Sequence, residues 1–146
     1  MRSSIVALVL ALASCPASGE QGRAQFTVAV TVPVRLQLEV IEQPTELRLS
    51  AEDVARGYKE VSARYRINHN DRHGYLLRIV PRSGIARHIE VRGLGANLVL
   101  GDDSVDIAQP GDTFQQELAL TFRFELNEAS YPGTFELPVS LAVTPL

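Results

Sequence analysis

The chain has 146 residues, a formal net charge of −3 and 45% hydrophobic residues, values that are ordinary for one globular domain. Its basic residues are scattered singly, so it lacks the clustered basic face that nucleic-acid binding needs. A domain of this size buries roughly two thirds of the surface that its unfolded chain exposes, and its core needs neither a metal nor a disulfide. The single cysteine, Cys15, has no partner for an internal disulfide.

The first residues have the pattern of a secretory signal peptide. Arg2 supplies the positive charge, and residues 5–13 form an apolar run of nine residues that small residues follow. This run is too short to span a bilayer, which takes about 20 helical residues. We expect residues 1–24 to be a signal peptide, with cleavage between residues 13 and 24, and the mature protein to be exported to the periplasm or the cell surface.

Two kinds of processing compete within this segment. Residues 12–15 read LASC and resemble the lipobox of bacterial lipoproteins, in which the cysteine, here Cys15, is lipidated and becomes the first mature residue. Ordinary signal peptidase sites also occur, at residues 11–13, at residues 17–19 and, farther from the apolar run, at residues 22–24. Pro16 and the shortness of the apolar run favour ordinary cleavage. A lipid anchor on Cys15 is the alternative, and it would be the only attachment to a membrane.

Every even position from residue 26 to residue 40 is apolar, a period of two that predicts extended strand. Fifteen residues at this spacing would run roughly 50 Å, far beyond the usual strand, so the stretch must be divided. Pro33 is the natural break because it cannot donate to a strand ladder. We predict an N-terminal arm over residues 26–32 and the first strand of the body over residues 34–41.

The arm allows two interpretations. It could add as a strand to a partner, in which case its alternate side chains would fill pockets there. It could instead be an ordinary edge strand that bends at Pro33 and crosses to the other sheet of its own domain. Under the first interpretation the partner-binding residues are Phe26, Val28, Val30 and Val32.

The rest of the chain alternates between short apolar strands and polar turns. After a strand at residues 46–49, the capping-box spacing of Ser50 and Asp53 and the stop at Gly57 predict one or two helical turns. Residues 61–67 and 74–80 are interpreted as a hairpin with the long loop NHNDRHG. Further strands are expected at residues 89–91, 97–100, 118–126 and 135–143, with a turn at residues 93–95. The pattern predicts an all-β protein, an antiparallel β-sandwich of seven to nine strands over residues 25–146.

No group of residues has the pattern of an enzyme site, and we expect no catalytic residues, no metal and no cofactor. His69, Asp71 and His73 share one loop but fall short of the usual ligand sets for zinc, and Asp102, Asp103 and Asp106 lack the ligand alternation of a calcium loop. Both groups are interpreted as loop and turn residues. Four glutamates that could form a glycosidase pair alternate with apolar positions and so should face solvent: Glu90, Glu117, Glu125 and Glu136.

The two ends of the mature chain resemble bacterial pilin-type subunits of chaperone-usher systems, and more closely the spore-coat-U-like secreted proteins associated with such systems. The resembling segments are AQFTVAVTVPVRLQLEV and YPGTFELPVSLAV, where residues 133–135 are similar to the family's Gly-Thr-aromatic start of the last strand. The resemblance implies an immunoglobulin-like fold that lacks one strand. A periplasmic chaperone, and then the arm of the next subunit, would complete it. This chain lacks the cysteine pair of many such subunits and has no aromatic residue near its C-terminus.

Two functions are compatible with this pattern. The first is a non-enzymatic structural or adhesive subunit of a surface fibre (a fimbrium), assembled by strand exchange with other pilin-like subunits and with a chaperone and usher as partners. The second is a periplasmic or lipid-anchored β-sandwich module that binds an unidentified ligand.

Overall fold

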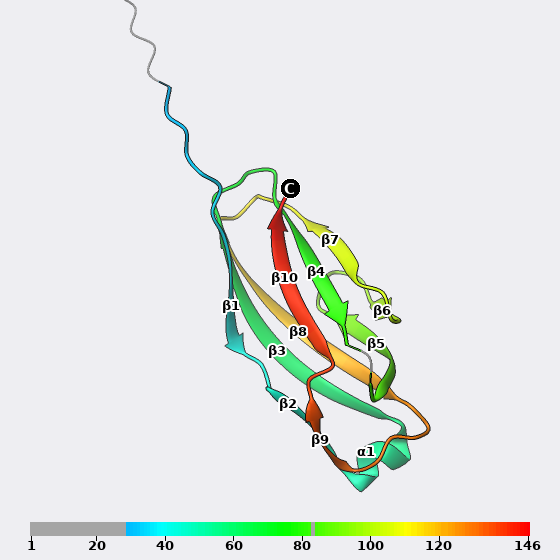
Figure 1. Ribbon diagram of the computed structural model, residues 1–146. Coiled ribbons are helices and arrows are strands. Elements are labelled where there is room, and N and C mark those ends of the chain that lie inside the picture. The colour runs from blue at the N-terminus through cyan, green and yellow to red at the C-terminus, as the bar shows by residue number, and fades with distance from the viewer. Residues whose placement is uncertain (1–28, 83) are drawn as a thin grey trace, which may run out of the picture. The chain divides into compact units, whose positions relative to one another are not determined.

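Antiparallel strands carry almost all of the regular structure in the computed structural model, which describes residues 29–82 and 84–146 (Figure 1). Residues 32–146 form one unit, and residues 29–31 belong to the unit before it. The elements of the larger unit are β1 (Leu36–Glu42), β2 (Glu46–Leu49), α1 (Ala51–Arg56), β3 (Tyr58–His69), β4 (Tyr75–Pro81), β5 (Ala86–Arg92), β6 (Leu98–Leu100), β7 (Val105–Gln109), β8 (Gln115–Leu126), β9 (Gly133–Glu136) and β10 (Val139–Pro145).

The strands form a β-sandwich, as the sequence pattern predicts. One sheet has five strands in the order β1-β3-β8-β5-β6, and the opposing sheet has three in the order β10-β4-β7. A separate pair, β2 and β9, joins the two layers at one end. Every strand pair in the described residues is antiparallel.

The core lies between the two sheets and follows the period-two pattern of the sequence. On β3 the residues Ala63, Tyr65 and Ile67 are buried, and the residues between them face out. They lie opposite Leu120, Leu118 and Gln116 of β8 in register. Tyr65 and Tyr75 are fully buried and direct their hydroxyl groups to glutamine side chains, so both polar ends are satisfied.

The helix α1 has the capping box that the spacing of Ser50 and Asp53 predicts. The Asp53 backbone donates to Ser50 Oγ at 3.1 Å, and the Asp53 carboxylate accepts from the Ser50 backbone at 3.0 Å. Gly57 ends the helix at a φ of 84°, in the left-handed region that favours glycine. Lys59 Nζ lies 2.8 Å from the buried Asp53 carboxylate and, with the Ser50 backbone, holds the pKa of that carboxyl well below its usual range.

Replacing Asp53 by asparagine is expected to lower the free energy of unfolding at pH 7 by about 1 to 3 kcal/mol, because the ion pair with Lys59 is lost and the charge-assisted hydrogen bonds from Ser50 are weakened. The pKa of Asp53 is lower in the folded than in the unfolded state. Its contribution to stability is therefore fully present above the unfolded value near 4 and is lost progressively as the pH falls from there toward the lower folded pKa. Urea unfolding at pH 7 and pH 3 should show a mutational loss that shrinks in acid. The exposed neighbour Glu52, changed to glutamine, is the control, and an equal loss for Asp53→Asn at both pH values would contradict this account.

The connection between β3 and β4 differs from the hairpin expected from the sequence. β3 belongs to the five-stranded sheet and β4 to the three-stranded sheet, so the two strands do not pair and residues 70–74 cross from one layer to the other. The His69 and Tyr75 rings meet across this crossing with centroids 5.3 Å apart. Alternation along a strand indicates which face is buried, but it does not indicate which strand lies alongside.

Residues 29–82 and 84–146 contain ten strands rather than seven to nine. Residues 105–109, interpreted as part of a turn region, form β7, and the single last strand expected over residues 135–143 is divided into β9 and β10. The division falls at Leu137 and Pro138, because proline cannot continue a hydrogen-bonded ladder. The turn expected at residues 93–95 is confirmed, with positive φ at Gly93 and Gly95.

Candidate functional site: an open seam between the two sheets

One seam of the sandwich is closed at one end and open along the rest. At the closed end β2 and β9 pair through residues 46–49 and 133–136. Beyond them the chain continues as β1 on one side and β10 on the other (Figure 1). Each is an edge strand of its own sheet, and the two strands approach each other without pairing. Each strand therefore has one backbone edge that no described strand occupies.

Apolar side chains along this open seam are covered less well than those deeper in the sandwich. The register places three β1 residues beside buried β3 residues, and Leu141 and Val143 of β10 beside buried β4 residues, while Val139 is itself buried, so all six belong to the inner faces of the sheets. Val40 is 54% exposed, whereas Ile67 in the neighbouring strand is 0% exposed. The inner-face residues of the seam are Leu36, Leu38 and Val40 on β1 and Val139, Leu141 and Val143 on β10.

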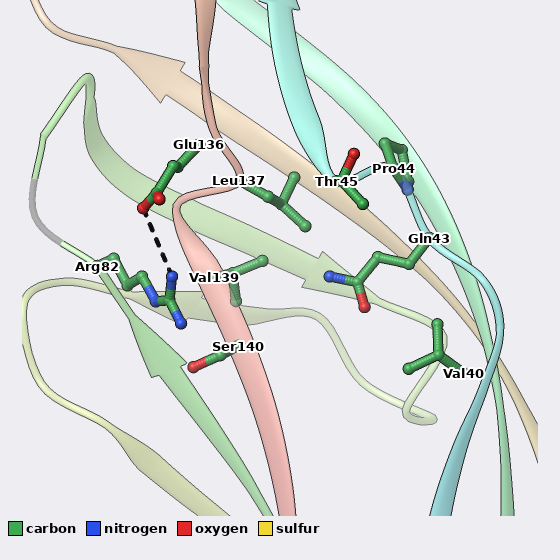
Figure 2. Close-up of a pocket in the computed structure, with 9 residues that line it drawn as sticks. All are labelled: Val40, Gln43, Pro44, Thr45, Arg82, Glu136, Leu137, Val139 and Ser140. Atoms are coloured by element: carbon green, nitrogen blue, oxygen red, sulfur yellow. Dashed lines mark ion pairs between the residues drawn. The ribbon is translucent and has the colours of Figure 1, made fainter.

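A pocket of about 370 Å³ lies where the seam opens (Figure 2). Val40, Leu137 and Val139 give it apolar walls from both sides of the seam. Polar groups surround them, among them Arg82 and Glu136, whose side chains form an ion pair at 3.7 Å. The pocket can therefore take an apolar side chain, with hydrogen-bonding groups within reach of a backbone.

Gln43, a polar residue in the pocket wall, is held in place by a hydrogen bond. Its Oε1 accepts a hydrogen bond from the Tyr65 hydroxyl at 3.1 Å. Burial raises the pKa of Tyr65 to about 12, so this hydroxyl stays protonated and donates at any physiological pH. The bond fixes the side of the pocket that β1 and the residues after it provide.

The N-terminal arm is described only in part. Phe26 and Val28, like Cys15 and the expected signal peptide, lie outside the described residues. Residues 29–35 form no strand, and Val30 and Val32 are 79% and 70% exposed. The described part of the arm is thus not paired as an internal edge strand. The role of the four alternating residues as partner-binding groups stays a prediction.

The loop that carries His69, Asp71 and His73 is organised differently from the expectation. His69 is the last residue of β3 and only 5% exposed, so it is not an open loop residue. Its Nδ1 donates to the Asp71 carbonyl at 2.9 Å. The His73 backbone N–H, at 2.9 Å, and the His73 ring, at 2.8 Å, bond the Asp71 carboxylate and hold the pKa of that carboxyl low. No three His, Cys, Asp or Glu side chains gather as metal ligands anywhere in residues 29–82 and 84–146.

Each of the four glutamates considered as members of a glycosidase pair lies beside an arginine. Glu90 pairs with Arg92 at 3.0 Å, and Glu117 pairs with Arg66 at 2.9 Å. These arginines lower the pKa of Glu90 and Glu117, which is the opposite of what a general acid needs. Glu125 and Glu136 pair with Arg123 and Arg82.

The acidic residues after β6 do not form one loop. Asp102 and Asp103 lie between β6 and β7, whereas Asp106 lies within β7 and is therefore not the turn residue expected from the sequence. Asp106 makes two hydrogen bonds with Arg78 of β4, both at 2.6 Å. Its carboxylate is thus used in joining two strands.

The fold and its site define this protein as an all-β antiparallel sandwich with one open, apolar seam. No protein-family model matches the chain, and neither a curated protein nor a solved structure shows significant similarity to it. In the part of the chain that the structure describes, no helix is long and apolar enough to cross a membrane.

Proposed function

We propose that this protein is a non-enzymatic, exported subunit of a surface fibre, and that one subunit donates its N-terminal arm to the open seam of the next. The observation that carries the proposal is the pair of facing strands, β1 and β10, that do not pair with each other and that leave inner-face apolar residues half-exposed. An added strand can bond to both edges and cover these residues at once.

The arm has the features that this seam requires. Its apolar residues lie at alternate positions, so all of them can point into the sandwich while the small and polar residues between them point out. Each buried side chain of this kind contributes roughly 1.5 to 3 kcal/mol before the cost of ordering the arm is subtracted. In the proposed fibre, these four side chains and the backbone hydrogen bonds of the added strand hold the subunits together. By the resemblance, a periplasmic chaperone would cover the seam before assembly and an usher would export the subunits.

A second function is supported by the pocket. Its volume of about 370 Å³ falls in the range of small-molecule sites, and it combines apolar walls with a few polar groups. A periplasmic or lipid-anchored binding module, working as a monomer, would use the pocket for a ligand instead of a strand. The two proposals differ in whether the exported protein assembles.

The test is the assembly of the exported protein compared with a chain that lacks residues 25–32. The buried core begins after residue 35, so this deletion leaves it intact. The full protein should form concentration-dependent oligomers, and the shortened chain should stay monomeric. A synthetic peptide of residues 25–32 should bind the shortened chain and raise its unfolding temperature. The control is the same peptide with Phe26, Val28, Val30 and Val32 replaced by serine.

A full-length protein that stays monomeric at high concentration, together with a shortened chain that does not bind the peptide, would contradict the fibre function. The binding module would then be the remaining proposal. Intact mass of the protein from the cell envelope gives the cleavage site and the state of Cys15 in the same preparation.

A further inference from the structure

Asn70, the first residue after β3, makes three hydrogen bonds to the chain just before β1. Its Oδ1 accepts from the Arg35 backbone at 2.6 Å, its Nδ2 donates to the Pro33 carbonyl at 2.8 Å, and its own backbone N–H donates to the Arg35 carbonyl at 3.2 Å. In the next residue pair of the β1–β3 ladder, Arg35 and Asn70, the Asn70 Oδ1 thus takes the place of the Asn70 carbonyl as acceptor. It holds residues 33–35 in line with β1.

The loop around Asn70 is itself fixed. The Asp71 carbonyl accepts from His69, and the Asp71 carboxylate accepts from the His73 backbone at 2.9 Å. Gly74, at a φ of 94°, and Gly111 pack so tightly against neighbouring backbone that a Cβ on either would overlap a carbonyl oxygen. Asn70, which holds the start of β1, therefore lies in a loop whose backbone is closely packed and hydrogen-bonded.

This arrangement restricts where the arm can go. An arm that filled the seam of its own domain would have to reverse direction and run back beside β1, and such a reversal takes a turn of at least about two residues. Pro33 keeps Val32 out of the helical region that tight turns use, and Asn70 holds residues 33–35 extended. A turn would then have to use residues 28–31, which include two of the four alternating apolar positions.

We propose that Asn70 is a positioning residue that keeps the arm out of its own seam and so reserves it for another subunit. This role rests on the proposed strand exchange. A tethered arm has an effective concentration of about 1 mM, so at micromolar protein a chain whose arm could reach its own seam would fill it in preference to a neighbour's. Without the Asn70 bonds, the protein would close on itself as a monomer.

The experiment compares the exported full chain with Asn70→Ala and with Pro33→Gly, which frees the same turn without altering Asn70. Asn127→Ala is the matched control. The Asn127 amide also stabilises a loop, by donating to the Gly84 carbonyl at 2.7 Å. Asn127 comes directly after β8, at the end of that strand that pairs with the start of β3 and is therefore far from Asn70. Two quantities are measured: the hydrogen exchange of the Val34, Arg35, β1 and β10 amides, and the rate of assembly at micromolar protein.

For Asn70→Ala and Pro33→Gly we expect a protected seam in a monomer and assembly slowed by about tenfold or more, and for Asn127→Ala we expect assembly at the wild-type rate. Assembly of Asn70→Ala at the wild-type rate would overturn the positioning role, whether or not the Val34 and Arg35 amides exchange faster. If the wild-type chain neither assembles nor gains protection from the peptide of residues 25–32, the strand exchange itself fails and the role of Asn70 fails with it. The two failures can be told apart, because failure of strand exchange appears already in the wild-type chain, whereas failure of the Asn70 role appears only in the Asn70→Ala variant.

Discussion

Leu141→Glu is expected to weaken binding of the arm peptide by about 100-fold or more. Leu141 lies on the inner face of β10, opposite Ile79 of β4, and is half-buried. A strand in the seam would enclose a glutamate there, and an unpaired carboxylate enclosed by apolar side chains costs roughly 3 kcal/mol or more. Without the arm the glutamate stays partly in water, so the unliganded domain should lose much less stability. Calorimetric titration of the chain lacking residues 25–32 measures the affinity.

Ala142→Glu is the matched control for this change. Ala142 is the next residue of the same strand, is exposed, and lies opposite Arg78 on the outer face. The Ala142→Glu change brings the same charge to the same strand but directs it away from the seam, so the affinity for the arm peptide should change little. Equal losses for the two variants, or full affinity in Leu141→Glu, would show that the arm does not lie against the inner face of β10.

Phe26→Ala is expected to produce the largest loss of any single change in the arm. Phe26 is the only aromatic residue among the alternating positions, and the pocket beside Val40 and Val139 has room for a large apolar side chain. Truncating a buried phenylalanine should cost about 2 to 3 kcal/mol, or roughly 30- to 150-fold in affinity. The measurement is peptide binding, followed by assembly of the full chain with the same substitution.

Thr27→Ala is the control, because Thr27 has the opposite parity and would face away from the core. Binding that falls as much for Thr27→Ala as for Phe26→Ala would mean that the arm does not bind as a strand with alternate faces. Loss of binding with retained assembly would place the subunit contact elsewhere on the protein.

Local features of this fold could be predicted well from the sequence. The alternation in residues 61–67 and 118–126 identifies most of β3 and β8, the two longest strands, which extend a few residues beyond these bounds, and the buried positions follow it. The capping box of Ser50 and Asp53 and the glycine stop at Gly57 are short-range signals, since their partners lie within a few residues. The strand at residues 46–49 is found at its predicted bounds.

Features that depend on distant partners could not be predicted in the same way. β3 and β4 both alternate, and nothing in their residues indicates that residues 70–74 carry the chain to the other sheet. Leu141 and Val143 were expected in a strand, but their partial exposure arises because β1 and β10 leave a seam, a property of the whole topology. Asn70 looks like an ordinary loop residue until Pro33 and Arg35 are seen beside it.

In the proposed assembly, the arm of another chain completes the open edges of β1 and β10. The most direct test mixes isotope-labelled chains that lack residues 25–32 with unlabelled full-length protein and follows hydrogen exchange of the labelled amides. The account predicts that β1 and β10 amides not bonded to β3 or β4 become protected only when the partner carries its arm, and not when that arm has Phe26, Val28, Val30 and Val32 replaced by serine. Open-edge amides that exchange equally fast with either partner would contradict it.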